Sequence, residues 1–349
     1  MTSTSDFNNL DLNLDQLLAV LPTLPHSKFI YRALNLIVEL SKTDSDRLDW
    51  KLLSGTLQDM HKALEMFHPY RHVRKVSIFG SARTNPDAPE YIQARQFAQQ
   101  VTEAGFMVLT GGGGGIMAAG NEGAGGDRSF GLNIYLPFEQ EPNPHLTDKR
   151  YVDFKYFFTR KLFFLRETDA IVIFPGGFGT QDELFESLTL LQTGKSTPKP
   201  VILIDQPQGR YWQEWDGYIQ SCLMARELIS SEDRSLYTIT TDIDKAIAKI
   251  TNFYKVYHSS RWVKDIFVIR LNFEISDSHL ERLNYLFCYR LIDGKITRSI
   301  ALEVETKDQD PDLDALPRLV MRFANYSYGY LQQLIWAING DLDVDLKVG

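Results

Sequence analysis

The chain has 349 residues, a length that favours about two domains or one domain with large extensions. Hydrophobic residues make up 44% and charged residues 23%, which excludes a disordered or fibrous chain. The formal net charge of −8 argues against a surface that binds nucleic acid or an anionic membrane. Two cysteines cannot form a disulfide framework, and the first residues lack the pattern of a signal peptide, so we expect a cytoplasmic protein.

The first expected region is an N-terminal arm with helices, residues 1–70. Residues 1–27 are acidic and leucine-rich and are expected to be loosely ordered. Between residues 28 and 68 apolar side chains recur at helical spacing, which predicts two helices. Two interpretations of these helices stay open: they pack on the next domain, or they present a face to a partner.

The second expected region, residues 71–258, alternates between strand and helix patterns. This alternation predicts the α/β class, with a Rossmann-like, doubly wound parallel sheet and helices on both faces. In such a sheet, ligands bind at the carboxyl ends of the strands near the topological switch point. The expected strands are 76–79, 106–110, 130–136, 170–174 and 201–204, and the expected helices are 90–104, 116–124, 157–167, 180–192, 212–226 and 242–256.

The third expected region, residues 259–349, is a C-terminal α+β extension built as strand, helix, strand and helix. It contains no recognisable catalytic constellation, so a regulatory or dimerising role and a purely structural role are equally open. The expected order is a strand at 266–273, a helix to Leu291 with a capping box of Ser278 and Glu281, a turn at Asp293-Gly294, a strand at 296–304 and a helix at 313–338.

The 23 glycines are unevenly distributed, because 11 of them lie between Gly105 and Gly131. One cluster of five follows an expected strand, and a second cluster of three follows another. Glycine lets backbone N–H groups approach an anion at the start of a helix. A flexible turn is the alternative, although five consecutive glycines carry a high entropic cost for that purpose. The expected ligand contacts are Gly111, Gly112, Gly113, Gly114, Gly115, Gly176, Gly177, Gly179 and the hydroxyl of Thr180.

Two adjacent cations, Arg160 and Lys161, lie in an otherwise apolar segment. Charges in such a setting are usually paired or face a ligand. The segment precedes the strand that leads to the second glycine cluster, so Arg160 and Glu183 are expected to reach one cleft. A structural ion pair is the alternative. For Asp182 and Glu186, compensation of the helix dipole is the simpler interpretation.

Three motifs together resemble the LOG ("lonely guy") family, and in particular its long bacterial-type members, formerly labelled lysine decarboxylase-like. They are TGGGGGIM at residues 110–117, TRK at 159–161 and PGGFGTQDE at 175–183. The resemblance covers residues 76–256 and implies a Rossmann-like fold. It also implies hydrolysis of the N-glycosidic bond of a nucleoside 5'-monophosphate, AMP or a related nucleotide, to the free base and ribose 5-phosphate.

The resemblance implies roles for individual residues and for partners. Arg160 and Glu183 would be the catalytic pair. No metal and no cofactor are implied, and the expected partners are the nucleotide substrate and further copies of the chain, in a homodimer or a higher homo-oligomer. Besides the glycines and Thr180, the implied substrate contacts are Ser81, Lys161 and Thr189.

Two other functions stay open at this point. One is a non-catalytic nucleotide-binding regulator whose terminal extensions transmit occupancy. The other is a dinucleotide-dependent enzyme, with Glu139 as the acid that binds a ribose. A metal pair of His68 and His72 is not expected, because Pro69 interrupts a helix between them.

Overall fold

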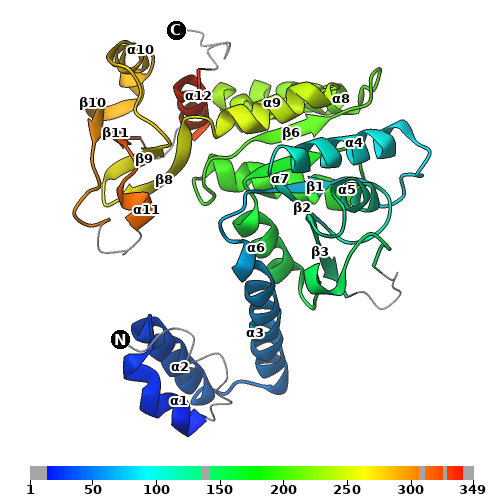
Figure 1. Ribbon diagram of the computed structural model, residues 1–349, viewed down its shortest axis with the longest axis vertical. Coiled ribbons are helices and arrows are strands. Elements are labelled where there is room, and N and C mark those ends of the chain that lie inside the picture. Colours follow the sequence, from blue (N-terminus) through cyan, green and yellow to red (C-terminus); the bar gives the residue numbers. More distant parts are fainter. Residues whose placement is uncertain (1–13, 136–141, 306–310, 325–327, 341–349) are drawn as a thin grey trace. The chain divides into compact units, whose positions relative to one another are not determined.

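The structure is a computed structural model that describes residues 14–135, 142–305, 311–324 and 328–340 (Figure 1). Its internal contacts divide the chain into two compact units, residues 1–57 and 58–349. In the described part of the chain, no helix is both long enough and apolar enough to cross a membrane.

The first unit is helical. It contains α1 (Leu14–Val20) and α2 (Ser27–Ser41), and α3 (Arg47–Phe67) begins in it and continues into the second unit. Asp46 starts α3, because its carboxylate accepts the N–H of Leu48 at 2.6 Å while its own N–H donates to Asp49 at 3.0 Å. The two helices predicted between residues 28 and 68 are therefore confirmed, while the domain boundaries at residues 70 and 258 stay predictions.

Seven parallel strands form the main sheet of the second unit, in the order β4-β3-β2-β1-β5-β6-β7. The chain places β2, β3 and β4 on one side of β1 and returns to place β5, β6 and β7 on the other. The direction of winding therefore reverses between β1 and β5, which confirms the predicted Rossmann-like sheet. The strands are β1 (Lys75–Phe79), β2 (Met107–Thr110), β3 (Ser129–Ile134), β4 (Tyr151–Phe154), β5 (Ala170–Ile173), β6 (Val201–Ile204) and β7 (Thr238–Thr240).

Helices cover both faces of this sheet, because alternate residues of each strand point to opposite faces. Val76 and Ile78 of β1 pack in one core with α4, α5 and α9. Leu109 of β2 packs on the other face with α3 and α6, and Ile173 of β5 packs there with α7 and α8. The helices are α4 (Pro89–Glu103), α5 (Ile116–Ala124), α6 (Phe157–Glu167), α7 (Phe178–Gln192), α8 (Tyr211–Tyr218) and α9 (Ile243–Phe253).

Two strands of this sheet, β4 and β7, were not predicted. They are the edge strands, with four and three residues, and such short segments carry little periodicity. The helix predicted at 212–226 is regular only to Tyr218. It continues as a π-helical segment, Ile219–Leu223, and a 3-10 turn, Met224–Arg226.

The C-terminal region has four strands, not the two that were predicted. They form an antiparallel sheet in the order β10-β11-β9-β8, packed against α10 and α12 (Figure 1). Its elements are β8 (Tyr257–Val263), β9 (Ile266–Leu271), α10 (Asp277–Phe287), β10 (Leu291–Ser299), α11 (Pro311–Asp314), β11 (Arg318–Phe323) and α12 (Tyr328–Ile338).

Three local predictions in this region are wrong. The long helix at 313–338 is interrupted by β11, because pairing with β9 and β10 outweighs an apolar pattern that fits either structure. The cap of α10 is Ser276 and not Ser278, since the Ser276 hydroxyl accepts the N–H of His279 at 3.2 Å. Gly294, with a φ of +73°, lies at an irregularity inside β10 and not between two elements.

Candidate active site

The carboxyl ends of β1, β2 and β5 meet at the switch point of the sheet, and backbone hydrogen bonds join their loops. Ser81, in the loop after β1, donates its N–H to the carbonyl oxygen of Pro175 at 3.1 Å. Its own carbonyl accepts the N–H of Ile116 at 3.0 Å. Ser81 therefore lies between the two glycine clusters, at 111–115 and 176–179, and the structure brings these three predicted segments to one edge of the sheet.

Buried amide side chains hold the first glycine cluster in one conformation. Asn143 Nδ2 donates to the carbonyl oxygens of Gly112 and Gly113, both at 3.0 Å, and to Asn121 Oδ1 at 2.9 Å. In a trans peptide the N–H points away from the preceding carbonyl. This clamp therefore turns the N–H groups of Gly113 and Gly114 away from the asparagines, toward the opposite side of the loop. Asn143 was not predicted as a site residue.

The glycines of the two clusters serve different purposes. Gly115 has a φ of +60°, and a Cβ atom there would lie 2.2 Å from a backbone oxygen of the β1 loop. A Cβ atom on Gly176 would lie 2.2 Å from Thr180 Oγ1. At Gly177 and Gly179, by contrast, it would meet no other described atom within 4 Å. Internal packing explains the first two glycines, whereas the last two border open space at the start of α7.

The loop before α7 is held by a tyrosine that was not predicted. Tyr211 of α8 donates its hydroxyl to the carbonyl oxygen of Gly176 at 2.5 Å and accepts the side-chain amide of Gln181 at 2.7 Å. The carbonyl of Gly177 accepts the N–H of Gln181 at 3.1 Å and so begins α7. The N-terminus of α7 is therefore fixed before any ligand arrives.

Asp59 of α3, also not predicted, fixes the start of α6. Its buried carboxylate accepts the N–H of Lys155 at 3.0 Å, the N–H of Tyr156 at 3.1 Å and the hydroxyl of Thr159 at 2.6 Å. A carboxylate at this position satisfies N–H groups that a helix leaves unpaired and stabilises the positive end of its dipole. Since Thr159 directly precedes Arg160, Asp59 positions the turn that carries both predicted cations.

The cations of α6 meet acidic side chains of α7. Lys161 Nζ lies 2.8 Å from Asp182 Oδ2, 3.3 Å from Glu183 Oε2 and 2.6 Å from Glu186 Oε2. Arg160 Nη2 lies 4.0 Å from Glu183 Oε1. The structure thus brings Arg160 and Glu183 together, as the sequence predicts. Asp182 and Glu186 lie beyond the first turn of α7, and both pair with Lys161.

The electrostatics of this cluster are set by burial. Glu183 is only 7% exposed, and burial raises the pKa of its carboxyl above the ordinary value, although Lys161 and Arg160 act to lower it. Burial acts to lower the pKa of the Lys161 ammonium, but hydrogen bonds to Asp182 and Glu186 raise it overall. The cluster therefore contains a firmly protonated lysine beside a carboxylate that is costly to ionise.

Some predicted residues lie apart from this cluster. Thr189 is exposed, about 9 Å along α7 from Glu183, and its hydroxyl donates to the carbonyl of Phe185 at 2.7 Å. The hydroxyl of Ser81 accepts the N–H of Arg83 at 3.1 Å. Glu139 lies outside the described residues. Among those that are described, no three His, Cys, Asp or Glu side chains are grouped so that they could hold a metal ion.

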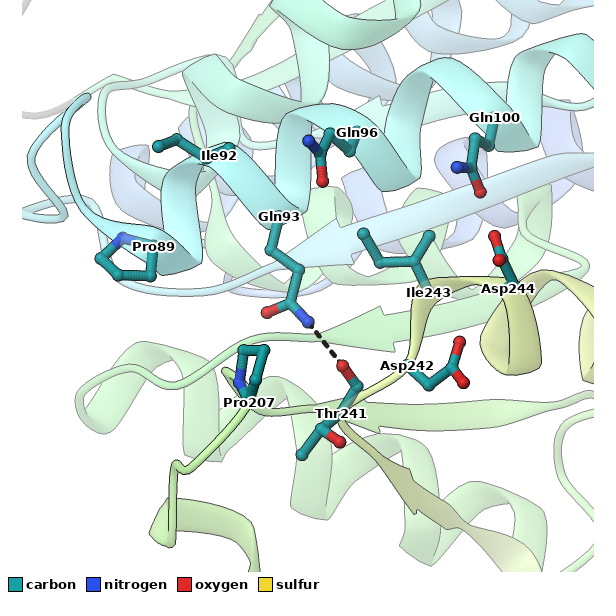
Figure 2. A pocket seen from close by; sticks show the side chains of 10 residues that line it. All are labelled: Pro89, Ile92, Gln93, Gln96, Gln100, Pro207, Thr241, Asp242, Ile243 and Asp244. Carbon is teal, nitrogen blue, oxygen red and sulfur yellow. Dashed lines mark hydrogen bonds between the residues drawn. The ribbon is translucent and has the colours of Figure 1, made fainter.

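A cavity of about 530 Å³ opens at the same edge of the sheet, beside the ends of β6 and β7 (Figure 2). Three glutamines of α4, Gln93, Gln96 and Gln100, face residues 241–244 across it, and the Gln93 amide donates to the carbonyl of Thr241 at 3.0 Å. None of the site residues predicted from the sequence lines this cavity, so it is separate from the cluster around Glu183.

Comparison with known proteins finds sequences that are similar to part of this chain. A family profile described as "Possible lysine decarboxylase" matches residues 114–250. A probable cytokinin riboside 5'-monophosphate phosphoribohydrolase from Oryza sativa subsp. japonica is 32% identical over 156 residues. That match covers 43% of this chain and 58% of the rice protein, so the chain spans little more than half the length of this relative.

Similar solved structures include two proteins that handle the molybdenum cofactor. The molybdenum cofactor binding protein from Rippkaea orientalis is 19% identical with a TM-score of 0.36. The molybdenum cofactor carrier protein from Chlamydomonas reinhardtii is 20% identical with a TM-score of 0.35. Each match covers 51% of this chain and 96% of the other. The profile match spans two of the three motifs, TRK and PGGFGTQDE, and the rice protein is similar to part of this chain.

Proposed function

We propose that this chain hydrolyses the N-glycosidic bond of a nucleoside 5'-monophosphate, AMP or a related nucleotide, in the cytoplasm. The products are the free base and ribose 5-phosphate. The observation that carries the proposal is the buried Glu183 carboxylate, with Lys161 and Arg160 within 4.0 Å, next to an open glycine loop at a helix start. The rice relative is named for a reaction of this kind.

In this proposal, the start of α7 binds the phosphate of the nucleotide. Helix N-termini attract anions through unpaired N–H groups and the helix dipole. Gly177 and Gly179 leave the backbone uncovered there, and the Thr180 hydroxyl adds a donor. Binding the phosphate fixes the sugar, so that the reacting carbon is held in position without further loss of freedom. The first glycine cluster closes around the rest of the nucleotide.

Glu183 and Arg160 act at the bond that breaks. The bond between C1' and the base nitrogen cleaves, its electron pair leaves with the base, and the oxygen of a water molecule bonds to C1'. Glu183 stabilises the positive charge that develops on the sugar and accepts a proton from the water. Arg160 offsets the negative charge on the departing base, which takes up a proton. Lys161 opposes the rise in the pKa of Glu183 that burial causes, and so favours the ionised carboxylate.

The test is incubation of the purified protein with AMP, GMP, CMP and UMP, with free base measured by chromatography. Glu183→Gln and Arg160→Ala should each lower base release by at least a hundredfold. Glu186→Gln is the matched control, because Glu186 also binds Lys161 but lies one turn further along α7. It should change the rate by only a few-fold. Nucleotide binding without release of any base would contradict the proposal and would favour a non-catalytic regulator.

A homodimer is part of the proposal. Four large apolar side chains are exposed near the cluster: Phe157, Phe158, Leu162 and, with 96% of its surface exposed, Phe178. Apolar groups gathered in this way commonly mark a protein interface. Light scattering after size-exclusion chromatography should give twice the chain mass for the wild type, and Leu162→Glu combined with Phe178→Glu should give the monomer. A monomeric wild type would contradict it.

A further inference from the structure

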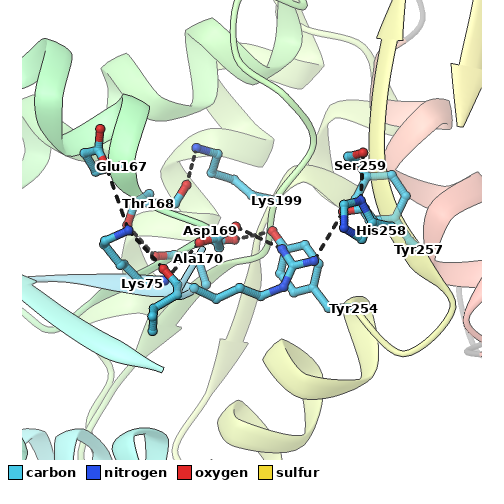
Figure 3. Close-up of polar contacts among 12 residues, drawn as sticks. Lys75, Glu167, Thr168, Asp169, Ala170, Lys199, Tyr254, Tyr257, His258 and Ser259 are labelled. Carbon is cyan, nitrogen blue, oxygen red and sulfur yellow. Dashed lines mark hydrogen bonds and ion pairs between the residues drawn. The ribbon is translucent and has the colours of Figure 1, made fainter. Parts of the chain in front are cut away.

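A second cavity of about 530 Å³ lies at the opposite edge of the main sheet, where β1, β5 and β6 begin and β8 follows α9 (Figure 3). Its lining comes from residues 71–75, 166–169, 197–199, 254 and 257–260 together with Leu313. The four residues of β5 alone separate this edge from the glycine loops by about 13 Å. The cavity is therefore distinct from the proposed nucleotide site.

The lining of this cavity is strongly basic. Five lysine or arginine side chains and two carboxylates line it, which leaves a charge of +3 when the two lining histidines are neutral. The whole chain, by contrast, has a net charge of −8. Positive charge concentrated in a concave surface attracts anions, and low-polarity walls increase the effect. The five cations are Arg71, Arg74, Lys75, Arg166 and Lys199.

Both carboxylates in the cavity are already paired with cations of the lining. Asp169 Oδ1 accepts Arg74 Nη1 at 2.9 Å, and Asp169 Oδ2 accepts the backbone N–H of Lys75 at 2.9 Å. Glu167 lies 3.7 Å from Lys75 Nζ and pairs with Arg166. The remaining positive charge thus has no further carboxylate among the residues that line the cavity.

Structural roles account for only part of this basic cluster. Lys199 Nζ donates to the carbonyls of Leu165 at 2.8 Å and Thr168 at 2.6 Å, and so binds the carboxyl end of α6. Burial lowers the pKa of Lys199 to about 8, so its positive charge is costly here. Arg71 and Arg166 are exposed at the rim and hold no backbone carbonyl by a described bond. Packing explains Lys199, but it does not explain why two more arginines face the same space.

We propose that this cavity binds a small phosphate-bearing anion, separately from the nucleotide substrate. Arginine presents paired N–H donors that match two oxygens of a phosphate, and Ser259 and Ser260 add hydroxyl groups to the lining. The volume lies within the range of roughly 300–1,000 Å³ that is usual for sites of small molecules. The site depends on residues outside the candidate active site, so it does not require the proposed hydrolysis.

The test is a calorimetric titration of the full chain with pyrophosphate, in a buffer that contains no other phosphate compound. The wild type should bind one pyrophosphate per chain in the second cavity. The double variant Arg71→Glu and Arg166→Glu should weaken this binding at least tenfold, because it replaces two rim cations by carboxylates. Both side chains are exposed, so the variant should fold, and circular dichroism checks this.

The matched control is the double variant Arg210→Glu and Arg226→Glu. It makes the same change in net charge at two exposed arginines that do not line the cavity. The control should bind pyrophosphate within twofold of the wild type. Equal weakening in both double variants, or no pyrophosphate binding to the wild type, would overturn the proposal.

The milder pair Arg71→Gln and Arg166→Gln gives the same comparison if the reversed charges disturb folding. Because both double variants leave the proposed nucleotide site unchanged, failure of the proposed hydrolysis would leave this test intact.

Discussion

The Nζ atom of Lys161 lies 3.3 Å from Oε2 of Glu183, and this contact joins the first turns of α6 to the second turn of α7. The two residues are 22 positions apart in the sequence, and β5 runs between them. Lys161 also binds Asp182 and Glu186, so one ammonium serves three carboxylates. Of the three, Glu183 is the one removed from solvent, and its protonation therefore responds most to a change at Lys161.

Replacement of Lys161 by Met should move the acid limb of the pH profile for base release to higher pH. Burial raises the pKa of Glu183, and Lys161 opposes that rise, so the pKa increases further when the lysine is lost. An enzyme that needs an ionised carboxylate loses activity as the pH falls through the pKa of that carboxylate. A higher pKa therefore moves this loss of activity to a higher pH. The measurement is kcat/KM from about pH 4 to pH 8.

The control for this profile is Lys155→Met. Lys155 is exposed in the loop before α6 and stacks on Tyr156 at 5.3 Å from the ring centre. Its removal should leave the acid limb where the wild type has it. If the acid limb of Lys161→Met lies at the same pH as that of the wild type, titration of Glu183 does not cause the loss of activity at low pH.

Asp59→Ala should both destabilise the protein and reduce base release. The substitution leaves two backbone N–H groups without their acceptor, while the Thr159 hydroxyl keeps only the carbonyl of Tyr156, and about 3 kcal/mol is lost from the free energy of unfolding. The turn that carries Arg160 loses its anchor, so kcat should fall more than KM rises. Urea unfolding and steady-state kinetics measure the two effects.

The comparison for Asp59 is Asp242→Ala. Asp242 also caps a helix, since its side chain accepts the N–H of Lys245 at 3.1 Å, but α9 carries no residue of the candidate site. It should lose about 1 kcal/mol of stability and keep its kcat. A kcat of Asp59→Ala equal to that of Asp242→Ala would show that Asp59 has only a structural role.

Two glycine substitutions should distinguish a glycine that internal packing requires, Gly115, from one that the proposed phosphate site requires, Gly179. Gly115→Ala places a Cβ 2.2 Å from a backbone oxygen at a positive φ, and should lower stability by more than about 2 kcal/mol. Gly179→Ala meets open space inside α7 and should keep or slightly raise stability, by up to about 1 kcal/mol. Its KM for the nucleotide should nevertheless rise about tenfold, because the methyl group enters the proposed phosphate site. An unchanged KM would show that the ligand does not use this space.

The contrast between these glycines also shows what the sequence could and could not predict. Clustered glycines after two strands indicated two loops that the structure brings to one edge of the sheet, and the residue ranges of α5, α6 and β6 were predicted without error. Apolar runs and helical spacing within a single segment carry such information locally. The sequence alone could not show that internal packing requires a glycine at position 115 whereas Gly179 borders open space. That difference depends on the loop after β1, whose backbone lies against Gly115.

The residues that hold the site in place were missed for the same reason. Asp59 and Thr159 are 100 positions apart, Asn143 and Gly112 are 31 apart, and no motif connects either pair. A buried acid in a helix or an asparagine between two prolines has many explanations in a single sequence. The motifs therefore marked the residues of the candidate site, and the residues that position them became visible only through the packing of α3, α6 and the glycine loop.

Lys199→Met should change the pH dependence of stability on the alkaline side. Burial lowers the pKa of Lys199 in the folded protein to about 8, whereas the unfolded chain has the ordinary value of 10.5. Between these values the unfolded chain binds a proton that the folded chain has released, so this residue raises stability as the pH increases through the window. The total gain is at most about 3.5 kcal/mol, as the shift converts at ~1.4 kcal/mol per unit.

The measurement is urea unfolding of both proteins at intervals from pH 7.5 to about pH 10, in a buffer without phosphate. The stability of the wild type relative to Lys199→Met should increase across this range. Tyrosines whose pKa is raised by burial, such as Tyr91 and Tyr257 at about 12, act in the opposite direction at higher pH, but they are common to both proteins and cancel in the difference. Parallel stability curves would mean that Lys199 keeps its proton in the folded state, held by the carbonyls of Leu165 and Thr168 that close the end of α6.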